Sequence, residues 1–218
     1  MSEQPRSLVL ASASPRRKAI LGQLGVTFTV VPSGIDEAAL PDEAPEAHVQ
    51  RLAREKAGEV RARLAGEASQ LIDMPLRSSA SAPRQAAPWV LAADTVVVID
   101  GAVLGKPSDD ADAARMLAQL SGQVHRVLTA LCLCDAASER SFERLMVSEV
   151  RFRELDRATV EAYVKSGEGR DKAGSYAIQG LGAGLVREIA GSYTNVVGLP
   201  AAETVDMLLD AGVLKVWP

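Results

Sequence analysis

The stretch Trp89-Val90-Leu91-Ala92-Ala93-Asp94-Thr95-Val96-Val97-Val98-Ile99 is almost wholly apolar and is followed by Asp100-Gly101. Its β-branched residues are typical of a strand, and Asp-Gly is typical of a hairpin turn. The sequence therefore predicts a strand that begins at Trp89, is interrupted at Asp94 and Thr95, and continues from Val96.

Asp94 is the unusual residue of this stretch. A lone carboxylate disfavours a strand and is costly to bury without a partner. We therefore expect a metal, a cation or a polarised water molecule beside it. A structural ion pair or a β-bulge would explain it equally well. In a regular strand, Thr95 would point to the opposite face.

Outward from this stretch, strand and helix patterns alternate first, then strands dominate, and then helices return. This order predicts a mixed α/β fold rather than a strict doubly wound sheet. We expect residues 124–134 and 145–152 to form a hairpin or to be neighbours. The other expected strands are 8–11, 26–31 and 185–189, and the expected helices are 16–24, 44–64, 109–120, 156–165 and 201–211, with caps at Ser14, Ser108 and Asp156.

The bulk composition limits the class of protein. The chain has 218 residues, 47% of them apolar, which suits one domain over residues 1–218, with a mobile insertion at 73–88. A net charge of −4 and the lack of basic stretches with aromatic residues argue against nucleic-acid binding. No apolar run reaches about 18 residues, so we expect no membrane span.

Cysteine usage indicates the compartment. Cys132 and Cys134 would face the same side of a strand, too far apart along it for an easy disulfide. Two cysteines that belong to no disulfide framework are typical of a reducing environment, and we expect a cytoplasmic protein.

Ser12-Ala13-Ser14-Pro15-Arg16-Arg17 indicates an anion site. Small residues at the end of a strand, followed by the N-terminus of a helix, present free N–H groups to an anion. Two arginines in the first turn oppose the usual preference for acidic residues there, and phosphate would account for them. A solvated pair of arginines beside an ordinary cap is the alternative.

Weaker signals lie elsewhere. Gly105-Lys106-Pro107 would fix a lysine on a stiff loop, and Glu37 and Lys56 could be plain surface charge. The Walker A spacing is absent, and Gly180-x-Gly182-x-Gly184 does not match a dinucleotide fingerprint. His48 and His125 lack metal-ligand spacing, so we interpret both as structural.

Six motifs nevertheless occur in a familiar order. They are S-x-S-P-R-R, A-D-T-V-V, G-K-P, S-G-x-x-H-x-V-x-T (Ser121 to Thr129), D-K-A-G-x-Y-x-I-Q-G (Asp171 to Gly180) and G-S-Y-x-N-V-V-G-L-P (Gly191 to Pro200). Together they closely resemble the Maf family of nucleoside triphosphate pyrophosphatases, from about Leu8 to Gly212. The Asp171–Gly180 motif resembles the corresponding motif of the branch that acts on dTTP and UTP.

The resemblance implies a mixed twisted sheet with flanking helices, in two lobes around a cleft, similar to inosine triphosphate pyrophosphatases. It also implies a homodimer and an enzyme that cuts a nucleoside triphosphate between the α and β phosphates with a divalent cation, Mg²⁺ or Mn²⁺. The proton acceptor falls on Asp94, and the specificity positions fall on Arg16, Thr95 and Gln179.

The remaining expected roles follow from charge. Lys56, Lys106 and Lys172 join Arg16 and Arg17 as cations around the triphosphate, with Ser12 and Ser14 at the anion site. Asp94 and Glu37 are the expected metal ligands. Catalysis would then depend on Asp94, Glu37, Lys56 and Lys106. The alternative function is a nucleotide-binding regulator of cell division and septum formation with little catalysis.

Overall fold

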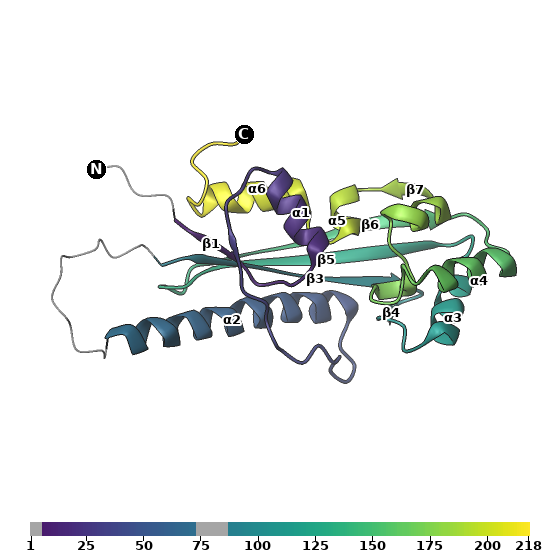
Figure 1. The fold of residues 1–218 in the computed structure, drawn as a ribbon, viewed down its shortest axis with the longest axis horizontal. Helices are drawn as coiled ribbons and strands as arrows, with labels where there is room; N and C mark the ends of the chain where they lie inside the picture. The colour runs from purple at the N-terminus through teal and green to yellow at the C-terminus, as the bar shows by residue number, and fades with distance from the viewer. Residues whose placement is uncertain (1–5, 73–86) are drawn as a thin grey trace.

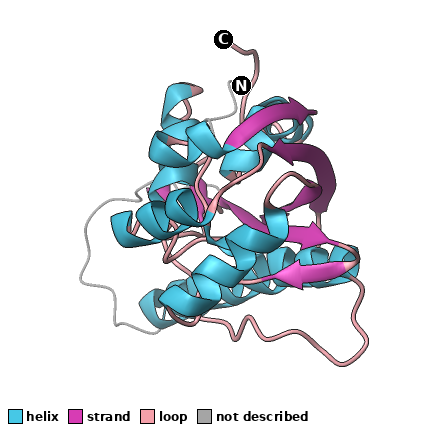
Figure 2. Ribbon diagram, turned by 90° about the vertical axis from the view of Figure 1, so that its right-hand side faces the viewer, coloured by secondary structure: helices cyan, strands magenta, loops and turns pink. Residues whose placement is uncertain are grey.

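The structure is a computed structural model that describes residues 6–72 and 87–218, with the side chains of residues 67–72 left out. The molecule is elongated, and its long strands run along the long axis between a layer containing α1 and α6 and the helix α2 (Figure 1). The end-on view shows helices on both sides of the strands (Figure 2). The predicted insertion at 73–88 lies outside the described residues except for its last two positions.

The described strands form one mixed, seven-stranded sheet in the order β2-β1-β3-β5-β6-β7, with β4 paired to β3 beside this path. Strands β1 and β2 are parallel to their partners, and the other pairs are antiparallel. The strands are β1 (Leu8–Leu10), β2 (Thr29–Val30), β3 (Trp89–Ile99), β4 (Ala102–Leu104), β5 (Val124–Asp135), β6 (Ser141–Phe152) and β7 (Val186–Ala190).

Helices flank this sheet, as the sequence predicted. The α-helices are α1 (Pro15–Gln23), α2 (Pro45–Ile72), α3 (Asp110–Leu120), α4 (Arg157–Ser166), α5 (Tyr193–Val197) and α6 (Ala201–Asp210), and the 3₁₀ helices are η1 (Ala173–Ser175) and η2 (Gly180–Leu185). Within the described residues, no helix is long and apolar enough to cross a membrane.

The two faces of β3 enter different cores because successive side chains of a strand point to opposite sides. Leu91, Ala93 and Val97 join the larger core, which includes residues of α1, α3 and α6. The even-numbered residues join the core beneath α2, where Ala57 and other small side chains of the helix are fully buried. Asp94 therefore faces α2, and Thr95 faces the opposite side.

A gap in the sheet lies beside the middle of β3. Strand β1 pairs with β3 only as far as Leu91, and β4 pairs with it only from Val97. Among the described residues, no strand pairs with residues 92–96 on this side, whereas β5 pairs with them continuously on the other. The gap leaves Asp94 and Thr95 beside an open edge of an otherwise buried strand.

Several sequence predictions need correction. Strand β3 is not interrupted at Asp94, since its register with β5 runs through Asp94 opposite Ala130 without a bulge. Residues 26–31 contribute only the short β2, and α2 extends beyond residue 64 to Ile72. The cap of α3 is Asp109 rather than Ser108, because the Asp109 carboxylate accepts the Asp112 N–H at 2.7 Å.

Other predictions are confirmed. Ser14 caps α1 with Pro15 in its first turn, Asp156 caps α4, and β5 and β6 form an antiparallel hairpin. Asp100 and Gly101 both have positive φ, as a two-residue hairpin turn requires. Cys132 and Cys134 are free and buried. The short elements η1, η2 and α5 were not predicted, because segments of three to six residues carry no readable periodicity.

Candidate active site

A cleft of about 580 Å³ opens at the gap beside β3. Its walls come from the β1–α1 connection, the loop after β2, helix α2, the loop after β4, the segment around η1, and the end of α5. All but one of the sequence-predicted site residues line it: Ser12, Ser14, Arg16, Arg17, Glu37, Lys56, Asp94, Thr95, Lys106 and Lys172. Gln179 is exposed and is not among the lining residues.

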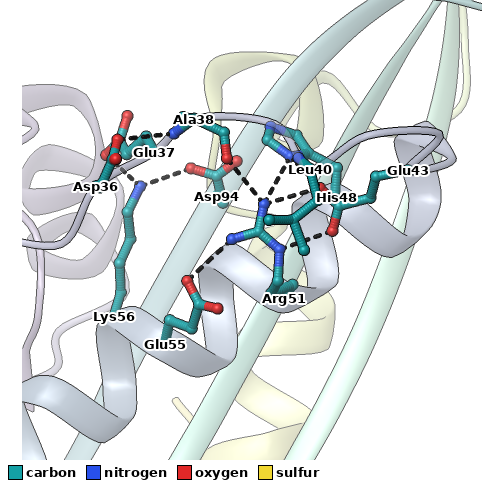
Figure 3. Close-up of polar contacts among 10 residues, drawn as sticks. All are labelled: Asp36, Glu37, Ala38, Leu40, Glu43, His48, Arg51, Glu55, Lys56 and Asp94. Atoms are coloured by element: carbon teal, nitrogen blue, oxygen red, sulfur yellow. Dashed lines mark hydrogen bonds and ion pairs between the residues drawn. The ribbon is translucent and has the colours of Figure 1, made fainter.

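Asp94 is paired with a buried lysine from α2. The ammonium Nζ of Lys56 lies 2.6 Å from Asp94 Oδ1 and 2.6 Å from Glu37 Oε1 (Figure 3). The Lys56 and Asp94 side chains are only 8% and 9% exposed, whereas Glu37 is half exposed. The strong partner expected for Asp94 is therefore a cation in this structure, and one ammonium holds both carboxylates side by side.

Glu37 is held in its charged form. Partial burial raises its pKa, but the hydrogen bond and charge of Lys56, together with the charges of Lys106 and Arg17, outweigh that effect. The net result is a pKa below the ordinary value of 4.5. Glu37 is therefore a carboxylate at neutral pH, available to a cation that enters from the cleft.

The donor set suits a metal ion that is shared with a substrate. Among the described residues, no group of three or more acidic, histidine or cysteine side chains could hold an ion alone. Mg²⁺ ordinarily takes one or two protein carboxylates and completes its shell with phosphate oxygens and water. Asp94 and Glu37, both bound to one ammonium, are a pair of carboxylates that could hold such an ion.

Arg17 connects α1 to the opposite face of β3. Its guanidinium donates to Thr95 Oγ1 at 3.1 Å, to the Gly198 carbonyl at 2.9 Å and to Ser12 Oγ at 3.3 Å. Ser14 Oγ accepts the Arg17 N–H and so caps α1. Arg17 and both serines are thus engaged with the protein itself, and all three line the cleft.

A neutral network continues behind Thr95. Thr95 Oγ1 lies 3.0 Å from Thr129 Oγ1, which donates to the Asn195 carbonyl at 3.0 Å. The Asn195 amide donates to the Val127 carbonyl and to Ser148 Oγ. Gly198 has a φ of 115°, and a Cβ there would lie 3.3 Å from Thr95 Oγ1. Glycine at 198 therefore permits the α5 end to approach β3 closely.

Two cations in the cleft have uncommitted nitrogens. Arg16 makes one long hydrogen bond, from Nε to the Val197 carbonyl at 3.4 Å, and its terminal nitrogens bond to no described residue. The Lys106 ammonium forms no hydrogen bond or ion pair within the described part of the chain, and it is exposed. Burial lowers the pKa of Arg16, which the charge of Asp171 opposes. Both groups are available to an anionic ligand.

Another wall of the cleft is the segment around η1, which packs closely against β3 and the loop after β4. Gly174 has a φ of 67°, donates to the Gly105 carbonyl, and lies so close to Val97 that a Cβ would meet its side chain at 3.0 Å. Lys172, just before it, pairs with Asp171. This packing sets Lys172 beside the Lys106 loop, which is where a site for a polyphosphate needs converging cations.

The two histidines have protein partners, as predicted. His125 is buried, and its Nε2 lies 2.8 Å from Tyr176 Oη. His48 Nδ1 lies 2.9 Å from Glu43 Oε2, although His48 also lines the cleft. The Nδ1 atom of His125 is buried without a hydrogen-bond partner among the described residues.

Sequence reasoning missed the residues that support the site. Thr129 and Asn195 lie inside motifs that were recognised, but polar side chains far apart in sequence gave no sign that they meet Thr95. Arg51 and Glu43 were not singled out, although both belong to the network beside Glu37 in Figure 3. The usable signal in the sequence would have been a polar residue inside a recognised motif at a position that is expected to be buried.

Comparisons with known proteins agree with the motifs. The family model for "Maf-like protein" matches residues 7–211. A protein of Shigella sonnei named "dTTP/UTP pyrophosphatase" is 46% identical over 96% of this chain and 95% of its own length. Proteins with the same name from Bordetella parapertussis and Desulfotalea psychrophila are 46% and 44% identical over 98% and 97% of this chain, and 96% and 97% of their own lengths.

Proposed function

The chain belongs to the family of Maf-like proteins, and on this premise we propose that it hydrolyses dTTP and UTP to the nucleoside monophosphate and pyrophosphate. The observation that carries the proposal is the position of Asp94. It lies at an open edge of a buried strand, it is held by Lys56, and Arg16 and Lys106 reach the same cleft. The names of the relatives point to the same two substrates.

The cations of the cleft bind the triphosphate in this proposal. A nucleoside triphosphate carries nearly four negative charges at neutral pH, and guanidinium groups bind phosphate oxygens through paired N–H donors. Arg16 and Lys106 are uncommitted and take the first contacts, and Lys172 exchanges Asp171 for a phosphate oxygen. Arg17 keeps its protein contacts and directs its charge toward the same site.

The chemical step is attack by water on the α phosphorus. A bond forms between the water oxygen and phosphorus, the bond to the α–β bridging oxygen breaks, and pyrophosphate leaves with the electron pair. Asp94 orients the water molecule and accepts its proton. Lys56 holds the Asp94 carboxylate in place for this task and balances its charge when no substrate is present.

We further propose that Asp94 and Glu37 hold a divalent cation, Mg²⁺ or Mn²⁺, that the substrate brings with it. Such an ion neutralises charge on the phosphates in the transition state. With an ion bound, one carboxylate or both would contact it in place of Lys56.

Base recognition is assigned to Arg16, Thr95 and Gln179. Gln179 offers an amide that both donates and accepts hydrogen bonds, as a pyrimidine edge requires. Its neighbour Ile178 lines the cleft, so Gln179 is adjacent to the site in sequence although its own side chain is exposed. The two free thiols suit the cytoplasm, and a homodimer is the expected assembly.

The activity is tested by pyrophosphate release. The purified chain is incubated with each natural deoxy- and ribonucleoside triphosphate, with Mg²⁺ or Mn²⁺, and pyrophosphate and monophosphate are measured. We expect the highest kcat/KM with dTTP and UTP. If no nucleotide yields product but nucleotide binding is saturable, the enzyme hypothesis would give way to that of a nucleotide-binding regulator.

A further inference from the structure

The segment that carries Glu37 has little structure of its own. Residues 33–43, named here the Glu37 loop, contain no helix or strand, and residues 36–42 are all exposed. Leu40, an apolar residue within it, is 54% exposed. Apolar packing therefore does not explain why Glu37 is held 2.6 Å from Lys56.

A buried ion pair holds the loop against α2. Arg51, in α2, donates from Nε to Glu43 Oε1 at 2.7 Å and from Nη2 to Glu43 Oε2 at 2.8 Å. The Glu43 side chain is 8% exposed, although it belongs to the loop, and that of Arg51 is 17% exposed. A bidentate ion pair with so little exposure to solvent connects the loop rigidly to the helix.

The same guanidinium reaches the residue next to Glu37. Arg51 Nη2 also donates to the Ala38 carbonyl at 3.0 Å, and Glu43 Oε2 accepts the Leu40 N–H at 3.2 Å (Figure 3). The contacts therefore span both ends of the exposed residues, beside Glu37 and just before α2. His48 Nδ1, 2.9 Å from Glu43 Oε2, closes the network on the helix side.

Arg51 does not line the cleft, but it shares a helix with Lys56, which does. Helix α2 thus provides the ammonium that contacts Glu37 and the guanidinium that bonds to the backbone of Ala38, the next residue. We propose that Arg51 is a positioning residue, which holds the Glu37 loop on α2 so that the Glu37 carboxylate stays beside Asp94 during turnover. The inference rests on the role proposed above for Glu37.

The test compares Arg51→Ala with Arg54→Ala. Arg54 lies one turn further along the same helix and pairs with Glu143 on β6, away from the loop. We expect Arg51→Ala to lower kcat by about ten- to a hundredfold, since small misplacements of catalytic groups have effects of this size. Affinity for a non-hydrolysable α,β-methylene analogue of dTTP should change less than about threefold, because Arg51 does not line the cleft. Arg54→Ala should behave like the wild type.

Two further variants separate positioning from folding. Arg51→Lys keeps the charge but cannot form the bidentate contact, so its kcat should lie between those of the wild type and Arg51→Ala. Hydrogen exchange at the Leu40 amide should accelerate in Arg51→Ala and in Glu43→Gln, with the core strands unchanged. This readout requires no activity.

The deciding measurement is a double-mutant cycle with Glu37→Gln. If Arg51 acts through Glu37, Arg51→Ala should have little further effect on kcat in the Glu37→Gln background. Equal losses in both backgrounds, or unaltered exchange at Leu40, would overturn the inference. Wild-type turnover by Glu37→Gln would also overturn it, while pyrophosphate release by the wild-type chain would leave the proposed activity standing.

Discussion

Asp94 and Thr95 are neighbours on one strand, yet their surroundings differ in kind. On the α2 face, Asp94 contacts a single ammonium that it shares with the half-exposed Glu37. On the other face, Thr95 belongs to a chain of hydroxyl and amide groups that ends in the fully buried Asn195. The first set contains charges that can exchange partners, whereas the second is a fixed set of hydroxyl and amide groups in which Arg17, bonded to Thr95, is the one charged member.

The difference shows how one strand serves two purposes. A charge-assisted contact can be replaced by a contact to a phosphate or a metal, so the Asp94 side can rearrange when substrate binds. Buried neutral hydrogen bonds are costly to leave unmade, so the Thr95 side resists rearrangement. The two faces can be separated experimentally by changing one residue on each.

The largest effect is expected from Asp94→Asn. The amide keeps the shape and an acceptor for Lys56 but loses the charge and the basic oxygen, so kcat should fall by about 10³-fold. Steady-state pyrophosphate release measures this, and thermal unfolding checks the fold. Asp135→Asn is the matched control, because Asp135 is also a buried, ion-paired aspartate, at the far end of β5. Turnover near that of the wild type would remove Asp94 from the reaction.

The second effect concerns the free energy of unfolding in acid. It depends on His125, which packs against Phe152 and Tyr176 in the core on the Thr95 side of β3. Burial lowers the pKa of His125 to about 4, against 6.5 for an exposed histidine. Between these values the unfolded chain binds more protons than the folded chain, so stability is lost as pH falls from 6.5 and levels off near 4. At pH 5 the loss from this one residue is about 2 kcal/mol.

His125→Gln isolates this contribution, since glutamine can still form a hydrogen bond with Tyr176 but does not titrate. Urea unfolding at pH 7 and pH 5 gives the change in free energy for each protein. The wild type should lose about 2 kcal/mol more than the variant over this interval. Equal losses in the two proteins would show that His125 is not the group responsible.

Much of this arrangement could be predicted from the sequence. The apolar run around Asp94 predicts a buried strand, and burial alone requires a partner for the carboxylate. The sequence could not decide between a metal, a cation and a bulge, because Lys56 is 38 positions away and becomes a neighbour only when α2 packs on the sheet. Glu37 and Lys56 were indistinguishable from surface charge for the same reason.

The Thr95 side of β3 was harder to predict than the Asp94 side. Ser12, Ser14 and Arg17 are predicted to bind phosphate because they lie at the start of a helix. Nothing in the sequence indicates that Arg17 also bonds to Thr95 on β3 and to the Gly198 carbonyl at the end of α5, while the two serines bond within residues 12–17. Local sequence signals identify a helix cap to within one residue, because the cap and its helix are adjacent in the sequence. A network such as Thr95–Thr129–Asn195 joins three separate elements, and its geometry exists only in the folded chain.

The smallest effect is expected from Thr95→Val, which removes one hydroxyl from this network. Arg17 Nη2 and Thr129 each lose a partner, so the free energy of unfolding should fall by about 1 to 2 kcal/mol. Because Arg17 keeps its bond to the Gly198 carbonyl, kcat should fall less than about tenfold, far less than for Asp94→Asn. Thr95→Ser, which retains the hydroxyl, should recover most of the stability. A loss of turnover as large as that of Asp94→Asn, without a loss of stability, would mean that Thr95 contacts the reacting groups directly. Catalysis and stability would then not be separated between the two faces of β3.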